Sequence, residues 1–205
     1  MLCLASAGGQ QGPVLSAAGA NVTVLDQSLK QLQCDRLVAE RESLDMHLIR
    51  GDMADLSMLS DAGFDIVFNP VSNCFAPNVR PVWQESFRVL RPQGVLMSGF
   101  LNPLFYMFDR DLDDQGTLAV KNPLPYSDLT RWKLEGIEPN AGKGEMFEFG
   151  HTLTDQIGGQ IDAGFLIAGF YEDYWSDKAT TLNKYTPTFI ATLASKPGDS
   201  RHWTL

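Results

Sequence analysis

The sequence predicts a doubly wound α/β domain with a mostly parallel sheet, and three observations support this fold class. Short apolar runs alternate with helical patterns along residues 1–101. A glycine-rich turn at residues 6–12 directly follows the first apolar run, and an acid, Asp26, ends the second. Alternation of this kind is typical of parallel strands joined by crossover helices.

The first elements form a βαβ unit. Residues 1–5 are an apolar run that predicts a buried strand leading into the glycine-rich turn. Pro13 suits the first turn of a helix, which we expect over residues 14–18, and Gly19 stops that helix. Residues 21–26 predict the second strand.

The alternation continues through the next two strands. A helix over residues 28–41 precedes a strand at 46–50. A short helix after Asp55 then precedes a strand at 64–68.

A helix over residues 79–90 leads into the fifth strand. It stops at Arg91-Pro92-Gln93-Gly94, because Pro cannot continue a helix and Gly supplies a turn. The strand at residues 95–100 follows.

The second half of the chain begins with a long insertion. Residues 102–145 hold many Pro, Asp and Gly residues together with several aromatic rings, and we interpret them as a lid. Beyond it we expect a helix over 152–163, a strand at 166–174 and a last strand at 186–193, before a polar tail. The whole chain, residues 1–205, is therefore expected to form one domain.

The composition narrows the function classes. A net charge of -9 and a pI near 4.7 repel phosphate backbones, and basic residues are scattered singly, so we expect no nucleic-acid partner. Cys3, Cys34 and Cys74 are widely spaced, which argues against a disulfide framework and a metal site. No apolar run approaches the roughly 20 residues that span a bilayer, so we expect no membrane partner and a cytoplasmic location.

The carboxyl ends of the strands are where a doubly wound sheet binds its ligands. The first such end carries residues 6–12, where glycines let a ligand approach closely and helix N–H groups favour a carboxylate or a phosphate. This loop alone does not separate methionine-type cofactors from dinucleotides. Asp26 is placed to accept hydrogen bonds from both hydroxyls of a ribose, and the alternative is a solvated helix N-cap.

Two further strand ends carry polar residues. After the third strand, Asp52 is placed to take an adenine amino group while Met53 covers the ring, although Asp is common in loops. After the fourth, residues 69–74 place small polar groups where the reacting end of a cofactor points. The alternative there is a Pro turn with capping Ser and Asn.

Together these segments resemble a known enzyme family. They are Leu2-Cys3-Leu4-Ala5-Ser6-Ala7-Gly8-Gly9-Gln10, Asp26, Gly51-Asp52-Met53 and Phe87-Arg88-Val89-Leu90-Arg91-Pro92-Gln93-Gly94. They resemble class I S-adenosylmethionine-dependent methyltransferases of the small-molecule type, close to ubiquinone-biosynthesis enzymes. The resemblance covers residues 1–101 and implies a Rossmann-like seven-stranded sheet with helices on both faces and an antiparallel last strand.

The resemblance also implies S-adenosylmethionine as the cofactor, S-adenosylhomocysteine as its product, and a set of cofactor-binding positions. These are Ala5, Ser6, Gly8, Gly9, Gln10, Asp26, Gln27, Gln31, Asp52, Met53, Ala54, Asn69 and Val71. Two positions differ from the family pattern, because Ala7 and Gln93 stand where members often carry Gly. Members usually carry a helical segment before the first strand, so a chain beginning at Met1 is expected to have an open cleft and low activity.

Methyl transfer is an in-line displacement at a sulfonium carbon, so alignment and exclusion of water supply much of the acceleration. An oxygen acceptor or a protonated nitrogen benefits from a general base, and the candidates are His151, Tyr106 and Asp109, which follow the fifth strand or flank the lid. Three other residues are expected to be structural or solvent-exposed: His47, His202 and Cys74.

The aromatic rings of the insertion have two interpretations. Phe105, Tyr106, Phe108 and Tyr126 form either an apolar acceptor pocket or a cluster that packs the insertion onto the sheet. The pocket would suit a small, largely hydrophobic or planar acceptor.

Two other function classes stay open at this point. A nicotinamide-dependent oxidoreductase uses the same βαβ unit and an acid for the ribose, although the glycine pattern is imperfect. A non-catalytic cofactor- or partner-binding protein can keep the same fold. The expected partner is a small-molecule acceptor, and a homodimer is compatible with the sequence.

Overall fold

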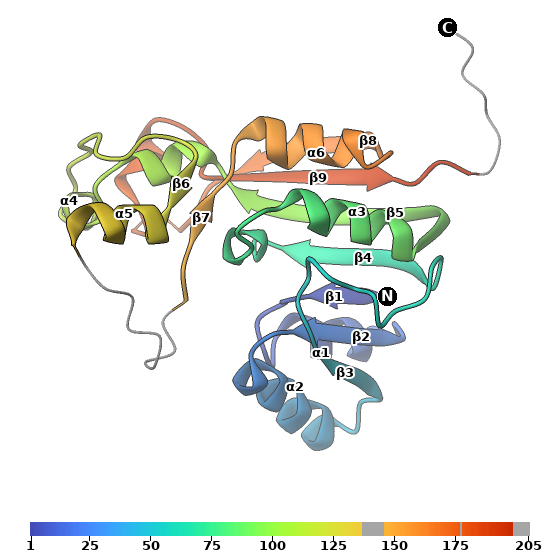
Figure 1. Ribbon diagram of the computed structural model, residues 1–205. Helices are drawn as coiled ribbons and strands as arrows, with labels where there is room; N and C mark the ends of the chain where they lie inside the picture. The colour runs from blue at the N-terminus through green and yellow to red at the C-terminus, as the bar shows by residue number, and fades with distance from the viewer. Residues whose placement is uncertain (137–145, 177, 199–205) are drawn as a thin grey trace, which may run out of the picture.

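Seven strands form the main sheet of the computed structural model, which describes residues 1–136, 146–176 and 178–198. Their order is β3-β2-β1-β4-β5-β9-β8 (Figure 1). Strand β9 pairs antiparallel with both of its neighbours, and the pairs among β1 to β5 are parallel. The strands are β1 (Leu2–Leu4), β2 (Val22–Asp26), β3 (Met46–Arg50), β4 (Phe64–Pro70), β5 (Leu90–Leu101), β8 (Leu166–Asp173) and β9 (Phe189–Ser195). The predicted fold class, with its antiparallel last strand, is confirmed.

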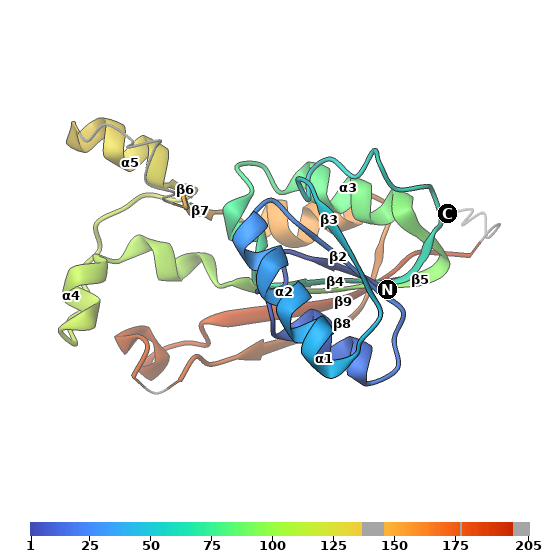
Figure 2. The same cartoon turned by 90° about the horizontal axis from the view of Figure 1, so that it is seen from below.

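Helices cover both faces of this sheet. Helices α1 (Gln11–Ala17) and α2 (Leu29–Glu42) pack on β2 and β3, whereas α3 (Arg80–Val89) and α6 (Gly159–Asp162) pack on β5 and β8. Figure 2 shows α3 on one side of the strands and α1 on the other. A π-helical turn, η3 (Thr154–Gly158), leads into α6, so the helix predicted over residues 152–163 is present but irregular.

The element boundaries follow the predicted ones closely. Strand β3 matches residue for residue, and α2 begins after its N-cap Ser28, whose hydroxyl accepts a hydrogen bond from Gln31 N. Strand β5 begins earlier than predicted because Leu90 pairs with Phe64 across an irregularity in the ladder. Helix α1 also begins earlier, at Gln11, so that Pro13 lies within its first turn.

The short helix predicted after Asp55 is absent, and that prediction was wrong. Turns replace the helix there, and α3 holds them. The Arg88 guanidinium donates to the carbonyl oxygens of Leu56 (2.7 Å) and Leu59 (2.9 Å), and Glu85 Oε2 accepts from Leu56 N (2.8 Å). Side chains far along the chain thus satisfy backbone groups that a helix would have satisfied internally.

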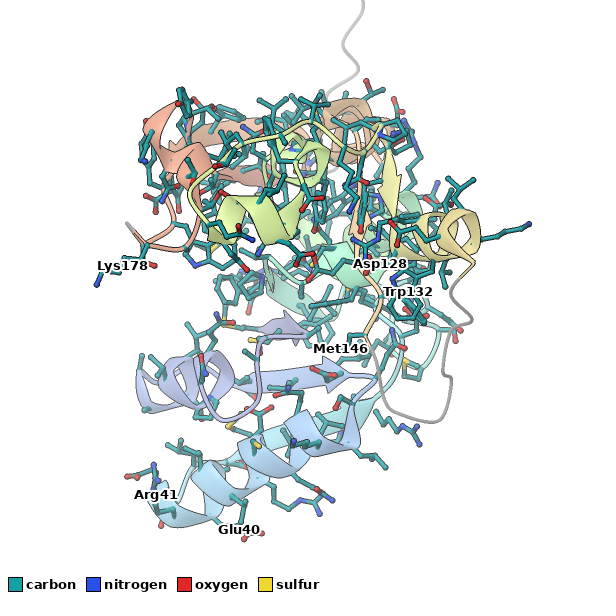
Figure 3. All side chains as sticks on the ribbon, turned by 90° about the vertical axis from the view of Figure 1, so that its left-hand side faces the viewer. Glu40, Arg41, Asp128, Trp132, Met146 and Lys178 are labelled. Carbon is teal, nitrogen blue, oxygen red and sulfur yellow. The ribbon has the colours of Figure 1, made fainter. Side chains whose placement is uncertain are left out.

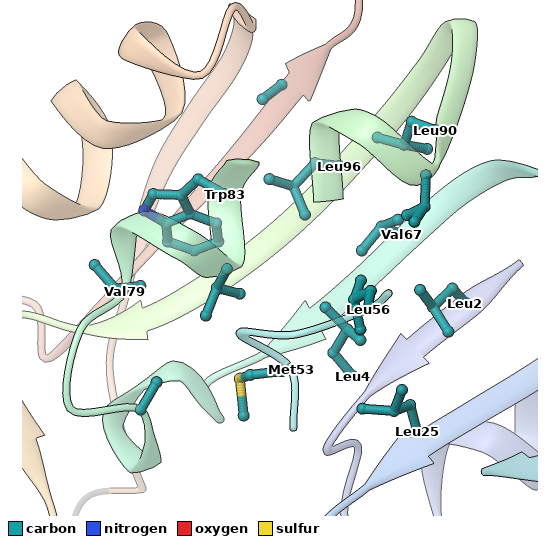
Figure 4. Packing of buried hydrophobic residues seen from close by; sticks show 14 of the residues in the cluster. Leu2, Leu4, Leu25, Met53, Leu56, Val67, Val79, Trp83, Leu90 and Leu96 are labelled. Carbon is teal, nitrogen blue, oxygen red and sulfur yellow. The ribbon is translucent and has the colours of Figure 1, made fainter. Parts of the chain in front are cut away.

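The main core lies between the sheet and α3. Trp83 is fully buried there and packs over β4 and β5 with Leu96 and Val67 (Figure 4). Leucines at the start of the chain, Leu2 and Leu4, join the same cluster. The apolar run that opens the sequence is therefore the centre of the domain.

The insertion packs around a core of its own, and its role as a lid stays a prediction. It holds η2 (Pro103–Met107), α4 (Arg110–Asp114), β6 (Tyr126–Ser127) and α5 (Asp128–Glu135), and β7 (Phe149–Gly150), just beyond its predicted end, pairs with β6. Phe105 and Tyr106 are buried in this second cluster with Leu101 of β5 and Leu182 of η4 (Thr181–Lys184). Of the two interpretations of these rings, the structure therefore supports the one in which they pack the insertion onto the sheet. It does not support an open acceptor pocket formed by Phe105 and Tyr106.

The two departures from the family pattern stand where the backbone favours glycine. Ala7 has φ 55° and Gln93 has φ 68°, both in the left-handed region, at the positions where members often carry Gly. A side chain there strains the backbone. The turn at Gln93 is held by a hydrogen bond from its N–H to the Lys196 carbonyl oxygen (3.0 Å).

No helix in the described part of the chain is long and apolar enough to cross a bilayer. Among the same residues, no group of three or more His, Cys, Asp or Glu side chains is arranged to hold a metal ion. His47 is exposed on β3, whereas His202 lies outside the described residues. Cys74 is buried, and burial raises the pKa of its thiol to about 12, which suits a structural role.

Candidate functional site

The candidate site lies at the carboxyl edge of β1, where the order of the strands reverses. Strand β1 is flanked by β2 on one side and β4 on the other, so the loops after all three strands meet there. This is the topological switch point at which open α/β sheets bind ligands. The loop of residues 5–10, Asp26 and the segment after β4 all belong to this edge.

The loop after β1 has an unusual backbone. Ala5, Ala7 and Gly9 have positive φ angles of 48°, 55° and 78°, whereas Ser6 and Gly8 between them do not. Two alanines in the left-handed region are costly, and such strain is concentrated at binding and catalytic sites.

Helix α2 holds this loop from behind. Gly8 N donates to Gln31 Oε1 and Gly9 N donates to Asp35 Oδ1, both at 2.8 Å. A Cβ on Gly8 would lie 2.1 Å from the Gln31 carbonyl oxygen, so Gly8 is required for the close approach of α2. Gly8 therefore has a packing role, and its predicted contact with a ligand stays a prediction.

Asp35 is the residue of this site that the sequence interpretation missed. It is 1% exposed on α2, and burial raises the pKa of its carboxyl while the Gly9 N–H lowers it. Asp26, another acid nearby, raises the pKa further. Its position nine residues after Asp26, on the inner face of the predicted helix, was the available signal.

We expect Asp35→Ala to destabilise the fold by about 1–2 kcal/mol and to weaken cofactor binding, because it leaves Gly9 N without its acceptor. Asp35→Asn is the matched control, since its amide oxygen can accept the same hydrogen bond. The pKa of the Asp35 carboxyl is raised in the folded protein, so ionisation of this carboxyl above that pKa lowers the free energy of unfolding. Protonation at lower pH restores the lost free energy. Wild type should therefore gain stability relative to Asp35→Asn as the pH falls toward about 4, measured by urea unfolding. Equal stability of Asp35→Ala and wild type would contradict this role.

Asp26 ends β2 beside the loop. It is 8% exposed, its Oδ1 accepts from Ser28 N (2.8 Å), and its Oδ2 has no donor among the described residues. Burial raises the pKa of this carboxyl. A buried carboxylate with an unused oxygen differs from a solvated N-cap, and Ser28 itself caps α2.

The segment after β3 presents one exposed and one buried candidate. Asp52 is exposed, and its Oδ1 accepts from Ala54 N (2.9 Å). Met53 is 3% exposed in the main core, with its sulfur 3.7 Å from Asn69 Nδ2. Its contact with a cofactor ring stays a prediction.

The segment after β4 combines a strained residue with an unsatisfied polar atom. Val71 has φ 60°, a costly conformation for a β-branched side chain. Asn69 is fully buried, and its Nδ2 donates to Ser72 Oγ (3.3 Å), which donates to the Leu4 carbonyl oxygen (2.9 Å). Asn69 Oδ1 has no hydrogen-bond partner, so the switch point contains a buried acceptor without a donor.

The remaining predicted cofactor residues line the rim of this edge. Ser6 is buried at the base of the loop, whereas Gln10 and Gln27 are exposed. Gln31 uses its side chain on Gly8 N and faces the loop. Their contacts with a cofactor stay predictions.

The three candidate bases differ in the hydrogen bonds, ion pairs and burial of their side chains. His151 Nε2 lies 3.3 Å from the Asn73 carbonyl oxygen, and burial lowers the pKa of this imidazole. Asp109 caps α4 and forms an ion pair with Lys121 (2.9 Å), which lowers the pKa of its carboxyl. Burial raises the pKa of Tyr106 far above neutrality. All three remain predictions as bases, and the first two have structural partners.

The fold and this edge define a Rossmann-like domain whose candidate ligand site lies at the switch point. Residues 2–98 match the family described as methyltransferase domain. The chain is 51% identical over 199 residues to the uncharacterized methyltransferase YbaJ of Bacillus subtilis, across 96% of this chain and 76% of that protein.

Two solved structures share the fold. An S-adenosylmethionine-dependent methyltransferase from Mesorhizobium loti has a TM-score of 0.70 at 18% identity and covers 95% of this chain and 89% of its own. One from Methanosarcina mazei has a TM-score of 0.68 at 15% identity, with coverage of 97% and 92%. At these identities the likeness shows the fold alone, whereas the Bacillus relative shows the family. The chain belongs to the class I S-adenosylmethionine-dependent methyltransferases.

Proposed function

We propose that this enzyme binds S-adenosylmethionine at the carboxyl edge of β1, β2 and β4 and transfers its methyl group to a small-molecule acceptor. The observation that carries the proposal is the pair of incompletely satisfied acceptors, Asp26 and Asn69, on the two strands that flank β1. A nucleoside with an amino-acid tail supplies donors for both, because it carries ribose hydroxyls and an ammonium group.

The residues present fit this cofactor. Asp26 Oδ2 would accept from the ribose, and Asn69 Oδ1 would accept from the ammonium group. Asp52, exposed beyond β3, would take the adenine amino group. When bound, the cofactor supplies an electrophilic methyl group on a positively charged sulfur.

The chain itself contributes positioning and exclusion of water. The loop after β1 is fixed by Gln31 and Asp35, and the segment after β4 is fixed by Ser72, so the walls of the site are preorganised. The lid adjoins the same edge, because β7 contacts η1 (Asn73–Phe75) after β4. An acceptor held between the lid and η1 would meet the methyl group in line, and alignment of this kind supplies much of a displacement's acceleration.

Calorimetric titration of the purified chain with S-adenosylhomocysteine, and separately with NAD at the same concentration, tests the cofactor assignment. We expect micromolar binding of the former and none of the latter. Binding of NAD alone would replace the proposal with a nicotinamide-dependent function. Binding of neither would favour a non-catalytic role for the fold.

A further inference from the structure

The turn after β4 has a strained backbone that its surroundings must hold. Val71 has φ 60°, and a β-branched residue keeps this conformation only where neighbouring groups fix it. Val71 N donates to the Gly99 carbonyl oxygen (2.9 Å), and the Val71 carbonyl oxygen accepts from Cys74 Sγ (3.3 Å). Ser72 Oγ donates to the Leu4 carbonyl oxygen (2.9 Å). These bonds fix the turn as far as Ser72, and η1 begins at the next residue.

A buried pair of amide side chains fixes the first residue of η1. Asn73 Nδ2 donates to Gln156 Oε1 (2.9 Å), and Gln156 Nε2 donates back to Asn73 Oδ1 (3.4 Å). Asn73 is 1% exposed and Gln156 is 4% exposed. Each amide gives the other one donor and one acceptor, so removal of either side chain leaves buried polar atoms unsatisfied.

The π-helical turn η3, which presents Gln156, is itself held by the core. Turns of this kind are rare and are frequent at functional sites. Arg80 Nε donates to Asp155 Oδ1 (2.8 Å), and Trp83 Nε1 donates to the Asp155 carbonyl oxygen (3.0 Å). Gln160 Nε2 donates to the Gln156 carbonyl oxygen (3.0 Å). Gln156 therefore holds η1 from a turn that is fixed to α3 and α6.

The chain that returns from the insertion contacts η1 as well. His151 Nε2 lies 3.3 Å from the Asn73 carbonyl oxygen, and β7 contacts η1. Figure 3 shows Asp128, Trp132 and Met146 on the part of this region nearest the first strands. Asn73 is thus held by Gln156 through its side chain, while its carbonyl oxygen faces His151.

Ser72 connects this pair to the proposed cofactor site. It directly precedes Asn73, and its Oγ accepts from Asn69 Nδ2 (3.3 Å). Asn69 Oδ1 is the buried acceptor that we assign to the ammonium group of the cofactor. A shift of Asn73 therefore moves the residue that orients this acceptor.

We propose that Gln156 is a positioning residue of the cofactor site, which acts through Asn73 to hold the strained turn after β4 in its binding-competent shape. This inference rests on the proposed function and adds a residue to it. Both polar atoms of the Gln156 side chain take part in the pair with Asn73. A fully satisfied buried polar pair fixes distance and orientation more narrowly than apolar packing, which suits a turn that must keep a strained residue in place.

Calorimetric titration of the full chain with S-adenosylhomocysteine tests this role. Gln156→Ala and Asn73→Ala should each raise Kd by about tenfold, and the double variant should bind no more weakly than the weaker single variant, because both changes remove the same pair. Thr180→Val is the matched control, since it removes another buried hydrogen bond, from Thr180 Oγ1 to Asp113 Oδ2 (2.6 Å). It should lower the free energy of unfolding and leave Kd unchanged.

Asn73→Asp provides a readout that a purely structural role would not change. A protonated carboxyl offers Gln156 one donor and one acceptor, as the amide does, whereas a carboxylate only accepts. The ratio of its Kd to that of wild type should therefore fall as the pH is lowered from about 8 to about 5. This variant keeps the size of the side chain and tests the inference if the alanine variants do not fold, and urea unfolding at each pH confirms that it is folded.

Several results would overturn the inference. They are an unchanged Kd in folded Gln156→Ala, additive losses of affinity in the double variant, and a Kd ratio in Asn73→Asp that does not depend on pH. Failure of wild type to bind S-adenosylhomocysteine would overturn the cofactor assignment together with this inference. The two kinds of failure are distinguished because wild type is titrated alongside each variant.

Discussion

Trp83→Ala is expected to destabilise the protein by about 3–5 kcal/mol, the largest effect on stability of any change considered. Trp83 is fully buried at the centre of the main core, and its indole Nε1 donates to the Asp155 carbonyl oxygen (3.0 Å). Truncation removes the ring, leaves a cavity between α3 and the sheet, and frees a part-buried carbonyl in the turn that leads to α6. Gly159 packs against the same ring so closely that a Cβ would lie 2.8 Å from Trp83 Cδ1.

Urea unfolding followed by circular dichroism checks this value. Trp83→Phe is the matched variant and should cost less, because it keeps most of the apolar volume and loses the hydrogen bond. Tyr185→Ala, at a side chain that is 74% exposed, should change stability by less than about 0.5 kcal/mol. A loss below about 1 kcal/mol in Trp83→Ala would show that the core repacks around the gap.

The first half of the fold was predictable because its signals are local. The apolar run at Leu2, the glycine-rich turn and the acid at Asp26 lie in one βαβ unit, so a short window of sequence contains both the strand and the helix that covers it. The stop at Pro92 likewise marked the boundary between α3 and β5 to within a few residues. The number of strands and the antiparallel last strand followed from the resemblance rather than from these local signals.

Long-range contacts account for what the sequence did not predict. Turns after Asp55 are held by Arg88 and Glu85 of α3, and no local pattern marks an arginine as a partner of carbonyls about thirty residues earlier. Asp35 looks like one more charged residue on a helix until the loop at Gly9 is seen to lie against it.

Ala7 and Gln93 are the two positions at which the sequence differs from the family pattern. Both positions adopt the left-handed backbone that Gly would enter more easily. Val71, after β4, adds a third non-glycine residue in the same region. Strain at the ends of β1 and β4 fits a site whose backbone shape is under stronger constraint than its side chains.

Asp26→Ala is expected to weaken S-adenosylhomocysteine binding by about 1–3 kcal/mol, roughly 5- to 150-fold in Kd. The carboxylate is 8% exposed, and one oxygen is engaged by Ser28 N while the other is available for ribose hydroxyls. Calorimetric titration of the folded variant measures the loss. Asp65→Ala removes an exposed carboxylate near the opposite end of β4, where it pairs with Arg91, and should leave the affinity unchanged.

A second variant and the pH dependence separate charge from shape at this position. Asp26→Asn retains an oxygen for Ser28 N and thus the start of α2, but it cannot accept two hydrogen bonds with a full negative charge, so its affinity should lie between those of wild type and Asp26→Ala. Burial raises the pKa of the Asp26 carboxyl, so acidification through that pKa should weaken binding in wild type and have less effect in Asp26→Asn. An unchanged affinity in folded Asp26→Ala would show that Asp26 does not bind the ribose and that its role is limited to the hydrogen bond with Ser28 N.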